Sequence, residues 1–388
     1  MASSHPSDAF VALPPATVGG VIVFAKNAGH TNEAVQEVIY CPAADHVTKT
    51  KCTYIEVDQL SHTHAVLLCK VPWMWGADMG ANEKGVCIGN IPVDSKSLGD
   101  ADKEGKLTGP DLVRLGLERG DSAKDALDII TSLIKTFGTG GSCSEGQESV
   151  FHNSFMIADR KEAWVLETAG KDWVAEQITE GVRNISNSYT IYTKRDEESD
   201  SIKDKGSDFD FCGTFQADTC SGRFAAAKEL IEKASGSLDV NAMMNILRDQ
   251  SSGVCQSGPD RMTVGSMVSI LTPEGSSAPC FHLVTATPDP SLSVFKPFAF
   301  TEDTSFPDFT VSPSKTDPKH KLYKLHEAAR GSLKQQDGQS KELKDVMLDL
   351  EQMALEGIKE TIQGQQVMSS DLKSLFEDCV DSEMKFYD

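Results

Sequence analysis

Strand-like and helix-like segments come in blocks along this chain, and their order limits the folds that it can adopt. Apolar runs at residues 10–13 and 21–24 flank a segment rich in proline and glycine, which predicts a hairpin at the amino terminus. Two more strands are expected at 52–60 and 64–71, and a turn at 82–85 leads into another. Blocks of strands followed by blocks of helices favour stacked sheets with helices outside, rather than a doubly wound parallel sheet.

Two helices are expected after these strands. The first covers residues 109–120, with a proline in its first turn and a glycine at its end. The second covers residues 122–138, where Ser122 and Asp125 form a capping box and Gly138 ends the helix. We expect this pair of helices to cover one outer face of the stacked sheets.

A second strand block and a second helix block follow. Residues 154–187 contain three short apolar runs separated by polar turns, which predicts an antiparallel meander. Helices are expected at about 222–234 and 239–248, and late strands at 267–271 and 281–286. This order again favours sheets that pack on each other, with the helices outside.

The composition of the chain changes at about residue 302. Residues 302–317 are polar and interrupted by prolines, so we interpret them as a linker. Beyond them, apolar residues recur at helical spacing, which predicts a helical extension over 318–388 that packs on the core. The main domain is then assigned to residues 7–301, and residues 1–6 to an N-terminal segment that is a candidate propeptide.

The charge of the chain excludes some classes of partner. Lys and Arg total 37 against 58 for Asp and Glu, a formal net charge of −21. Because phosphate contacts need basic patches, nucleic acid and anionic membrane are not expected as main partners. No apolar run approaches the ~20 residues of a membrane span. The first twenty residues also lack the features of a signal peptide, so we expect a cytoplasmic protein.

Cysteine and histidine patterns give no indication of a metal site. The ten cysteines include no C-x-x-C pair, and several lie in apolar runs, so most are expected to be small buried residues. The nine histidines include no H-E-x-x-H pattern. No cofactor and no metal is therefore expected.

Seven motifs in a shared order resemble those of the secernins, within the dipeptidase-A type of cysteine peptidase family. They are "CTYIEVDQ", "WMWGADMGANEKGVCIGN", "DLVRLGLERG", "EAWVLETAGK", "GVRNISN", "MVSIL" and "TPDPSLSVFKPFAF". The resemblance spans about residues 8 to 300 and resumes at "HKLYKLHEAA". It implies the N-terminal-nucleophile hydrolase fold, an α+β four-layer α-β-β-α sandwich of two antiparallel sheets, here with a helical C-terminal extension.

The resemblance also implies a mechanism in which the first residue of the mature chain is the nucleophile and its own α-amino group is the base. Such an amino group titrates near pH ~8, so it can accept a proton at neutral pH. The family has a cysteine where this chain has Ser7, and residues 1–6 must be removed before Ser7 can act. The family also has an aspartate, which holds the amino group, where this chain has Gly29. Serine is a weaker nucleophile that depends more on its base, so both departures predict weak or lost activity.

Other residues of the family pattern are retained. The resemblance implies that Asn187 positions the substrate or stabilises the oxyanion and that Arg223 supports the site electrostatically. Together with Ser7, Lys26 and Asn90, they are expected to converge on one cleft at the end of the first strand. Each residue also has a structural interpretation: a frayed terminus for Ser7, a solvated strand end for Lys26, a turn for Asn90, and fold maintenance for the other two.

Two functions of different class stay open. The first is a serine variant of an N-terminal-nucleophile hydrolase that acts on dipeptides or small amides. The second is a non-catalytic binding or regulatory protein linked to exocytosis, with protein partners of that process. A Ser-His-Asp esterase is less favoured, because no G-x-S-x-G motif occurs. The sequence leaves open whether residues 1–6 are removed, and it gives no oligomeric state.

Overall fold

The expected amino-terminal hairpin lies inside a six-stranded antiparallel sheet. The computed structural model describes residues 5–31, 34–146, 148–217, 222–335, 337–364 and 369–387. The strands of this sheet, in spatial order, are β14 (Gly181–Ile185), β1 (Asp8–Leu13), β2 (Ile22–His30), β16 (Met262–Leu271), β17 (Phe281–Val284) and β18 (Lys296–Phe298). Every residue of β1 and β2 is buried, so both faces of the sheet are covered at its centre.

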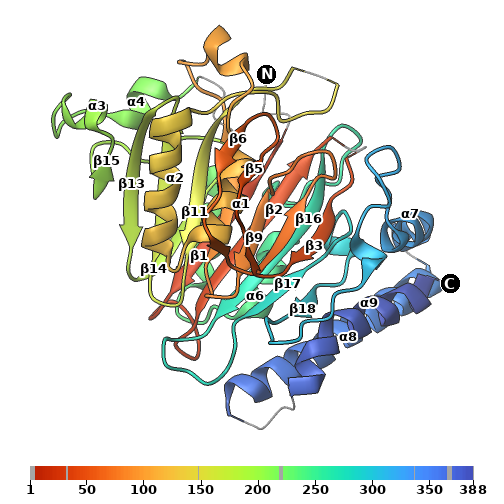
Figure 1. The fold of residues 1–388 in the computed structure, drawn as a ribbon. Coiled ribbons are helices and arrows are strands. Elements are labelled where there is room, and N and C mark those ends of the chain that lie inside the picture. The colour runs from red at the N-terminus through yellow and green to blue at the C-terminus, as the bar shows by residue number, and fades with distance from the viewer. Residues whose placement is uncertain are drawn as a thin grey trace.

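A second antiparallel sheet of eight strands packs on the first (Figure 1). Side chains of both sheets share one apolar cluster, in which Ala9 and Val11 of β1 meet residues such as Met156 and Val165. The strands, in spatial order, are β15 (Glu197–Glu198), β13 (Asp172–Ile178), β12 (Ala163–Ala169), β11 (His152–Ala158), β10 (Cys87–Val93), β9 (Met79–Asn82), β8 (Val66–Lys70) and β3 (Glu37–Cys41). Two short ribbons pair β4 (Ala44–Asp45) with β7 (His62–Thr63) and β5 (Lys49–Lys51) with β6 (Glu56–Asp58).

Helices cover the outer face of each sheet. The expected pair α1 (Gly109–Arg119) and α2 (Ala123–Phe137) packs on the eight-stranded sheet. Helices α5 (Arg223–Ala234) and α6 (Val240–Leu247) pack on the six-stranded sheet, against the β1 side chains that point away from the other sheet. The α-β-β-α sandwich is therefore confirmed. Shorter helices are η1 (Asp100–Lys103), α3 (Asp200–Lys203), α4 (Phe211–Phe215) and η2 (Pro290–Leu292).

The meander expected over residues 154–187 divides between the two sheets. Its three strands β11, β12 and β13 are neighbours in the eight-stranded sheet, as expected. The chain then crosses to the six-stranded sheet, where β14 pairs with β1 in a register that sets Ala9 opposite Ile185. This crossing carries the residues after Ile185 to the amino-terminal end of β1.

The C-terminal region is helical and packs on the sandwich. Apart from the turn η3 (Asp308–Thr310), residues 302–317 contain no helix or strand. Helices α7 (Lys321–Leu333), α8 (Gly338–Ile362) and α9 (Ser369–Tyr387) follow. Helices α8 and α9 lie beside strand β18 at the edge of the six-stranded sheet (Figure 1), and α7 packs on both of them. Fully buried Lys296 and Glu383 join β18 to α9 through an ion pair of 2.6 Å. Met347, Leu355 and Ile358 of α8 are buried in apolar clusters with residues of the sandwich, whereas Val346 and Met353 are exposed.

Candidate active site

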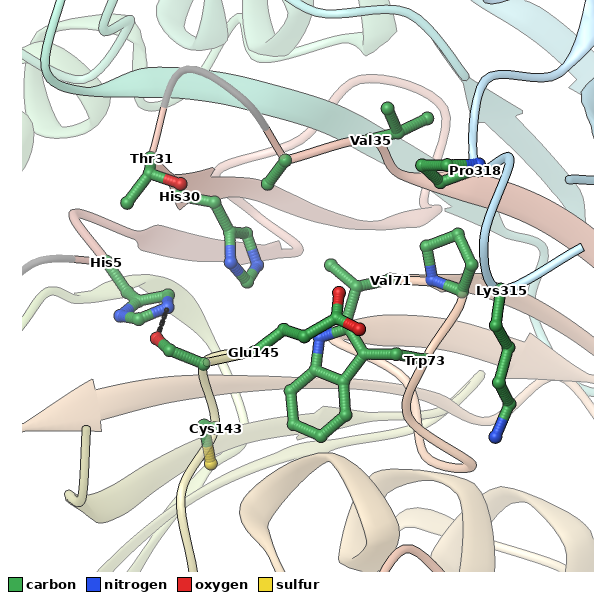
Figure 2. A pocket seen from close by; sticks show the side chains of 13 residues that line it. His5, His30, Thr31, Val35, Val71, Trp73, Cys143, Glu145, Lys315 and Pro318 are labelled. Atoms are coloured by element: carbon green, nitrogen blue, oxygen red, sulfur yellow. Dashed lines mark hydrogen bonds between the residues drawn. The ribbon is translucent and has the colours of Figure 1, made fainter. Parts of the chain in front are cut away.

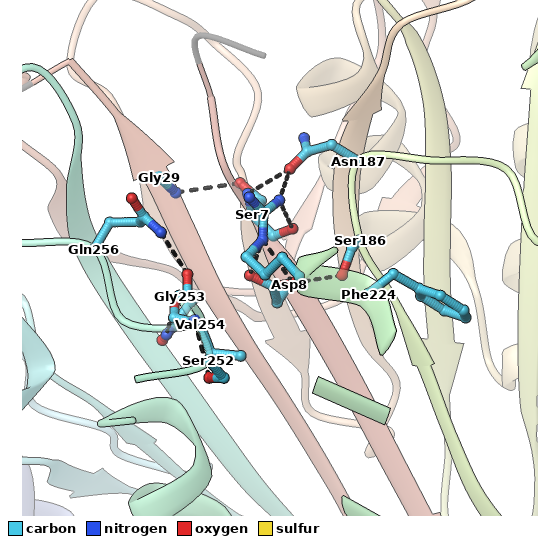
Figure 3. A network of polar contacts seen from close by, with 12 residues as sticks. Ser7, Asp8, Gly29, Ser186, Asn187, Phe224, Ser252, Gly253, Val254 and Gln256 are labelled. Carbon is cyan, nitrogen blue, oxygen red and sulfur yellow. Dashed lines mark hydrogen bonds and ion pairs between the residues drawn. The ribbon is translucent and has the colours of Figure 1, made fainter. Parts of the chain in front are cut away.

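Ser7 directly precedes β1 and is buried, with 3% of its surface exposed. Its Oγ accepts a hydrogen bond from the backbone N–H of Gly29 at 3.1 Å, and its own backbone N–H donates to Asn187 Oδ1 at 2.9 Å (Figure 3). His5 and Pro6 before it are buried as well. The interpretation of Ser7 as a polar residue at a frayed terminus is therefore wrong, because neighbouring strands hold both its side chain and its backbone.

The Asn187 side chain contacts the chain on both sides of residue 6. Its Nδ2 donates to the carbonyl oxygen of His5 at 2.9 Å and to that of Pro92 at 2.7 Å, while its Oδ1 accepts from Ser7. Asn187 reaches this position because β14 pairs with β1, although 180 residues separate it from Ser7. Its amide group therefore fixes the backbone around the Pro6–Ser7 peptide bond.

Arg223, the first residue of α5, supports Asn187 and Ser7 from the helix side. Its guanidinium pairs with the carboxylate of Asp8 at 2.9 Å and donates a short hydrogen bond to Asn187 Oδ1 and a longer one, 3.4 Å, to the Ser7 carbonyl. Burial raises the pKa of Asp8, and Arg223 opposes that rise. Ser186 adds a second hydrogen bond to the Asp8 carboxylate (Figure 3). Ser7, Asn187 and Arg223 thus form one polar network.

Lys26 lies between the two sheets rather than at a solvated strand end. Lys26 belongs to β2, opposite Ala9 of β1, and is 1% exposed. The interpretation of Lys26 as a solvated charge at a strand end is therefore wrong. A Cβ on Gly89 of β10 would lie only 2.5 Å from Lys26 Cδ, so this glycine makes room for the lysine side chain. Burial lowers the pKa of Lys26 to about 8, although the Asp78 carboxylate opposes the shift. Hydrogen bonds among the described residues do not join Lys26 to Ser7.

Asn90 lies inside strand β10 and not in a turn, which corrects the alternative interpretation. Its Nδ2 donates to Asn153 Oδ1 at 3.1 Å, and together with Ser7 and Gly29 it lines a small cavity of about 10 Å³. A space of that size holds about one water molecule. Asn187, Arg223 and Lys26 do not line it. The five expected site residues therefore lie in one region of the fold, but of these five only Ser7 and Asn90 line this cavity.

The residues that line this cavity and were not expected from the sequence include His5, His30 and Asp78. His30 at the end of β2 pairs with the Asp78 carboxylate at 3.1 Å, and Gln36 donates to the same carboxylate at 2.9 Å. Burial alone would raise the pKa of Asp78, but His30, Lys26 and the Gln36 hydrogen bond hold it below its usual range. A lone histidine after the "AKNAG" run carries no motif, so only the fold reveals this pair.

A larger cavity of about 250 Å³ adjoins the small one (Figure 2). His5, His30 and Cys143 line both, so these side chains separate the two spaces. Apolar side chains of Val35, Val71 and Trp73 line the larger cavity, with Glu145 and Lys315 as charged groups. Burial raises the pKa of the Cys143 thiol to about 12, so it is protonated at neutral pH.

The described ranges contain neither a candidate metal site nor a candidate membrane-spanning helix. Among these residues, no three His, Cys, Asp or Glu side chains are grouped so that they could bind a metal ion. Within the same ranges, none of the helices combines the length and the apolar character that crossing a membrane requires.

Comparison with known proteins gives one family match. Residues 74–202, which are 129 of the 388 residues, match the model of peptidase family C69. The matched segment contains Asp78, Asn90 and Asn187 but begins after Ser7 and Lys26 and ends before Arg223.

Solved structures similar to this chain are distant. A mutant conjugated bile acid hydrolase from Clostridium perfringens is 15% identical, with a TM-score of 0.42 over 78% of this chain and 99% of that one. The Caenorhabditis elegans ortholog of N-acylethanolamine-hydrolyzing acid amidase is 12% identical, with a TM-score of 0.40 over 67% of this chain and 91% of that one. These likenesses are too weak to bear on the activity of this chain.

Proposed function

We propose that this chain is a secernin-like hydrolase of dipeptides or small amides, of weak activity, in which Ser7 is the nucleophile once it is the first residue. The observation that carries the proposal is the hydrogen bond from the Ser7 nitrogen to Asn187 Oδ1, which Arg223 also contacts. After removal of residues 1–6, this nitrogen becomes an α-amino group, and the same oxygen would orient it. The match of residues 74–202 to peptidase family C69 supports this reaction class.

The residues around Ser7 suit the steps of amide hydrolysis. The free amino group would take the proton of the Ser7 hydroxyl as Oγ attacks the substrate carbonyl, and would then give it to the departing amine. Asn187 Nδ2 now donates to the His5 carbonyl, and after removal of residues 1–6 the same hydrogen would be available to a carbonyl of the substrate. Water would then hydrolyse the acyl group from Ser7. In the full chain the Ser7 nitrogen is a peptide amide, which is no base, so we propose that this form is inactive.

The test compares the full chain with a chain in which residues 2–6 are deleted and the initiator methionine is removed. Mass spectrometry checks that Ser7 is the first residue, and hydrolysis of a dipeptide mixture is measured. We expect the shortened chain to exceed its own Ser7→Ala variant by on the order of 10²-fold. The full chain should not exceed that variant. Equal rates for the shortened chain and its Ser7→Ala variant would overturn the proposal.

A second candidate is a non-catalytic binding or regulatory protein linked to exocytosis. The glycine at position 29, where the secernin-like pattern has an aspartate, favours it, because this residue offers no carboxylate to hold an amino group. Peptide binding without turnover by the shortened chain would favour this candidate over the hydrolase. A cytoplasmic location is part of both proposals, and partners of the exocytosis process belong to the second alone.

A further inference from the structure

The N-terminal residues His5 and Pro6 lie in the cleft beside Ser7 as a bound peptide would. Chain ends are usually exposed and poorly ordered unless something holds them. Here His5 is 4% exposed, Pro6 is buried, and Asn187 Nδ2 binds the His5 carbonyl at 2.9 Å. Specific contacts therefore hold these two residues in the cleft.

The His5 imidazole lies in a niche that fits a flat ring. It makes edge contacts with the rings of His30, at a centroid distance of 4.6 Å, and of Phe151, at 5.0 Å. Its Nε2 lies 3.2 Å from Ser144 Oγ (Figure 2). Burial first, and His30 second, lower the pKa of His5 to about 3, so the ring is neutral at pH 7. Two perpendicular ring contacts and one hydroxyl select an uncharged, planar side chain.

Gly29 makes the space for the next residue. A Cβ at this position would lie 1.8 Å from the Pro6 carbonyl oxygen, and the three nearest atoms all belong to Pro6. The backbone of Gly29 is in an ordinary extended strand, so its conformation does not require glycine. Glycine inside a strand usually costs stability, and it often marks a close approach of another backbone. Because residue 29 has no side chain, the Pro6 backbone can occupy this space.

We propose that the niche holding His5 and Pro6 is a binding subsite for peptides in which an imidazole or aromatic side chain precedes proline. The chain's own segment occupies this subsite in the full-length protein. The cavity of about 250 Å³ beyond His5 then accepts the residues that come before the ring. This inference rests on the proposed function only in treating such peptides as substrates. Binding of a peptide in the niche does not require that the peptide is hydrolysed.

The binding test uses the chain shortened to Ser7 and carrying Ser7→Ala, so that no turnover interferes. Calorimetry compares acetyl-His-Pro amide with acetyl-Ala-Pro amide. We expect the histidine probe to bind at least about tenfold more tightly, because two ring contacts are lost with alanine. The full chain should bind it at least about 10²-fold more weakly, since its own segment competes at high effective concentration. Equal binding of the two probes would overturn the inference.

A second measurement in the full chain covers the case in which the shortened chain does not fold. His5→Ala should leave a ring-sized cavity, so 4-methylimidazole should raise the melting temperature of this variant and not that of the unchanged protein. His62→Ala, at a histidine whose side chain is 56% exposed, is the control and should show no rescue. No rescue of His5→Ala would contradict the ring niche.

The binding and turnover tests separate the two proposals. Binding of acetyl-His-Pro amide, with no hydrolysis of the dipeptide mixture by the shortened Ser7 chain, would overturn only the proposed hydrolase activity. Hydrolysis by the shortened chain together with equal binding of acetyl-His-Pro amide and acetyl-Ala-Pro amide would overturn only the subsite.

Discussion

Gly29→Ala is the substitution that most directly tests how the N-terminal segment and strand β2 depend on each other. The added Cβ would lie 1.8 Å from the Pro6 oxygen, whereas real Cβ contacts are not found below 3.0 Å. The two groups must therefore separate by at least 1.2 Å, the difference between these distances. Gly29 is held in β2 by pairing with β16, opposite Thr263, so Pro6 is the group that must move.

The energy of this displacement follows from the contacts that the segment makes. Burying the His5 ring contributes about 1.5–3 kcal/mol, and its two ring contacts and the Asn187 hydrogen bond add about 0.5–1.5 kcal/mol each. Release of two residues returns about 1–2 kcal/mol of backbone entropy per residue. We therefore expect Gly29→Ala to lower the free energy of unfolding by about 1–3 kcal/mol. Without Pro6, alanine in a strand should instead stabilise by about 0.5–1 kcal/mol.

The assay is urea unfolding of Gly29→Ala in the full chain and in the chain shortened to Ser7. The sign of the change should reverse between the two backgrounds. Gly99→Ala is the matched control, because a Cβ there would meet no atom within 4 Å. Accessibility of the N-terminal segment to an aminopeptidase should rise in the full-length Gly29→Ala variant alone. Equal changes in stability in both backgrounds would refute the argument that Gly29 makes room for Pro6.

Two further predictions concern stability. Lys296→Met should lower the free energy of unfolding by about 3–5 kcal/mol, because the fully buried Glu383 carboxylate would lose its partner. The double variant Lys296→Met, Glu383→Leu should recover most of that loss in urea unfolding, and additive losses would contradict the pairing. Because the folded pKa of His5 is about 3 against 6.5 in the unfolded chain, its contribution to stability is complete above pH 6.5 and falls as the pH is lowered. The loss should be about 1.4 kcal/mol per pH unit until the segment is released. His5→Ala should therefore lose less stability than the unchanged protein between pH 7 and 5, and equal losses would contradict this.

Local sequence patterns predicted much of the sandwich. The hairpin of β1 and β2, the helix pair 109–138 and the meander of β11 to β13 are short-range features, which periodicity and caps specify. The block order then indicated stacked antiparallel sheets, because each block must bury an apolar face against another. Three local interpretations were wrong: a frayed terminus for Ser7, a solvated strand end for Lys26 and a turn for Asn90. Each was inferred from the position of the residue in the sequence alone.

The site itself was decided by the tertiary structure. The resemblance indicated Ser7, Asn187 and Arg223 as site residues, but only the departure of β14 from the meander brings Asn187 to the Ser7 nitrogen. Likewise, no periodicity shows that His30 pairs with Asp78 or that Pro6 rests on Gly29. The physical reason is that strand pairing and close packing join residues far apart in the chain. Local sequence records which face of a strand is apolar, but not which distant backbone or side chain will lie against it.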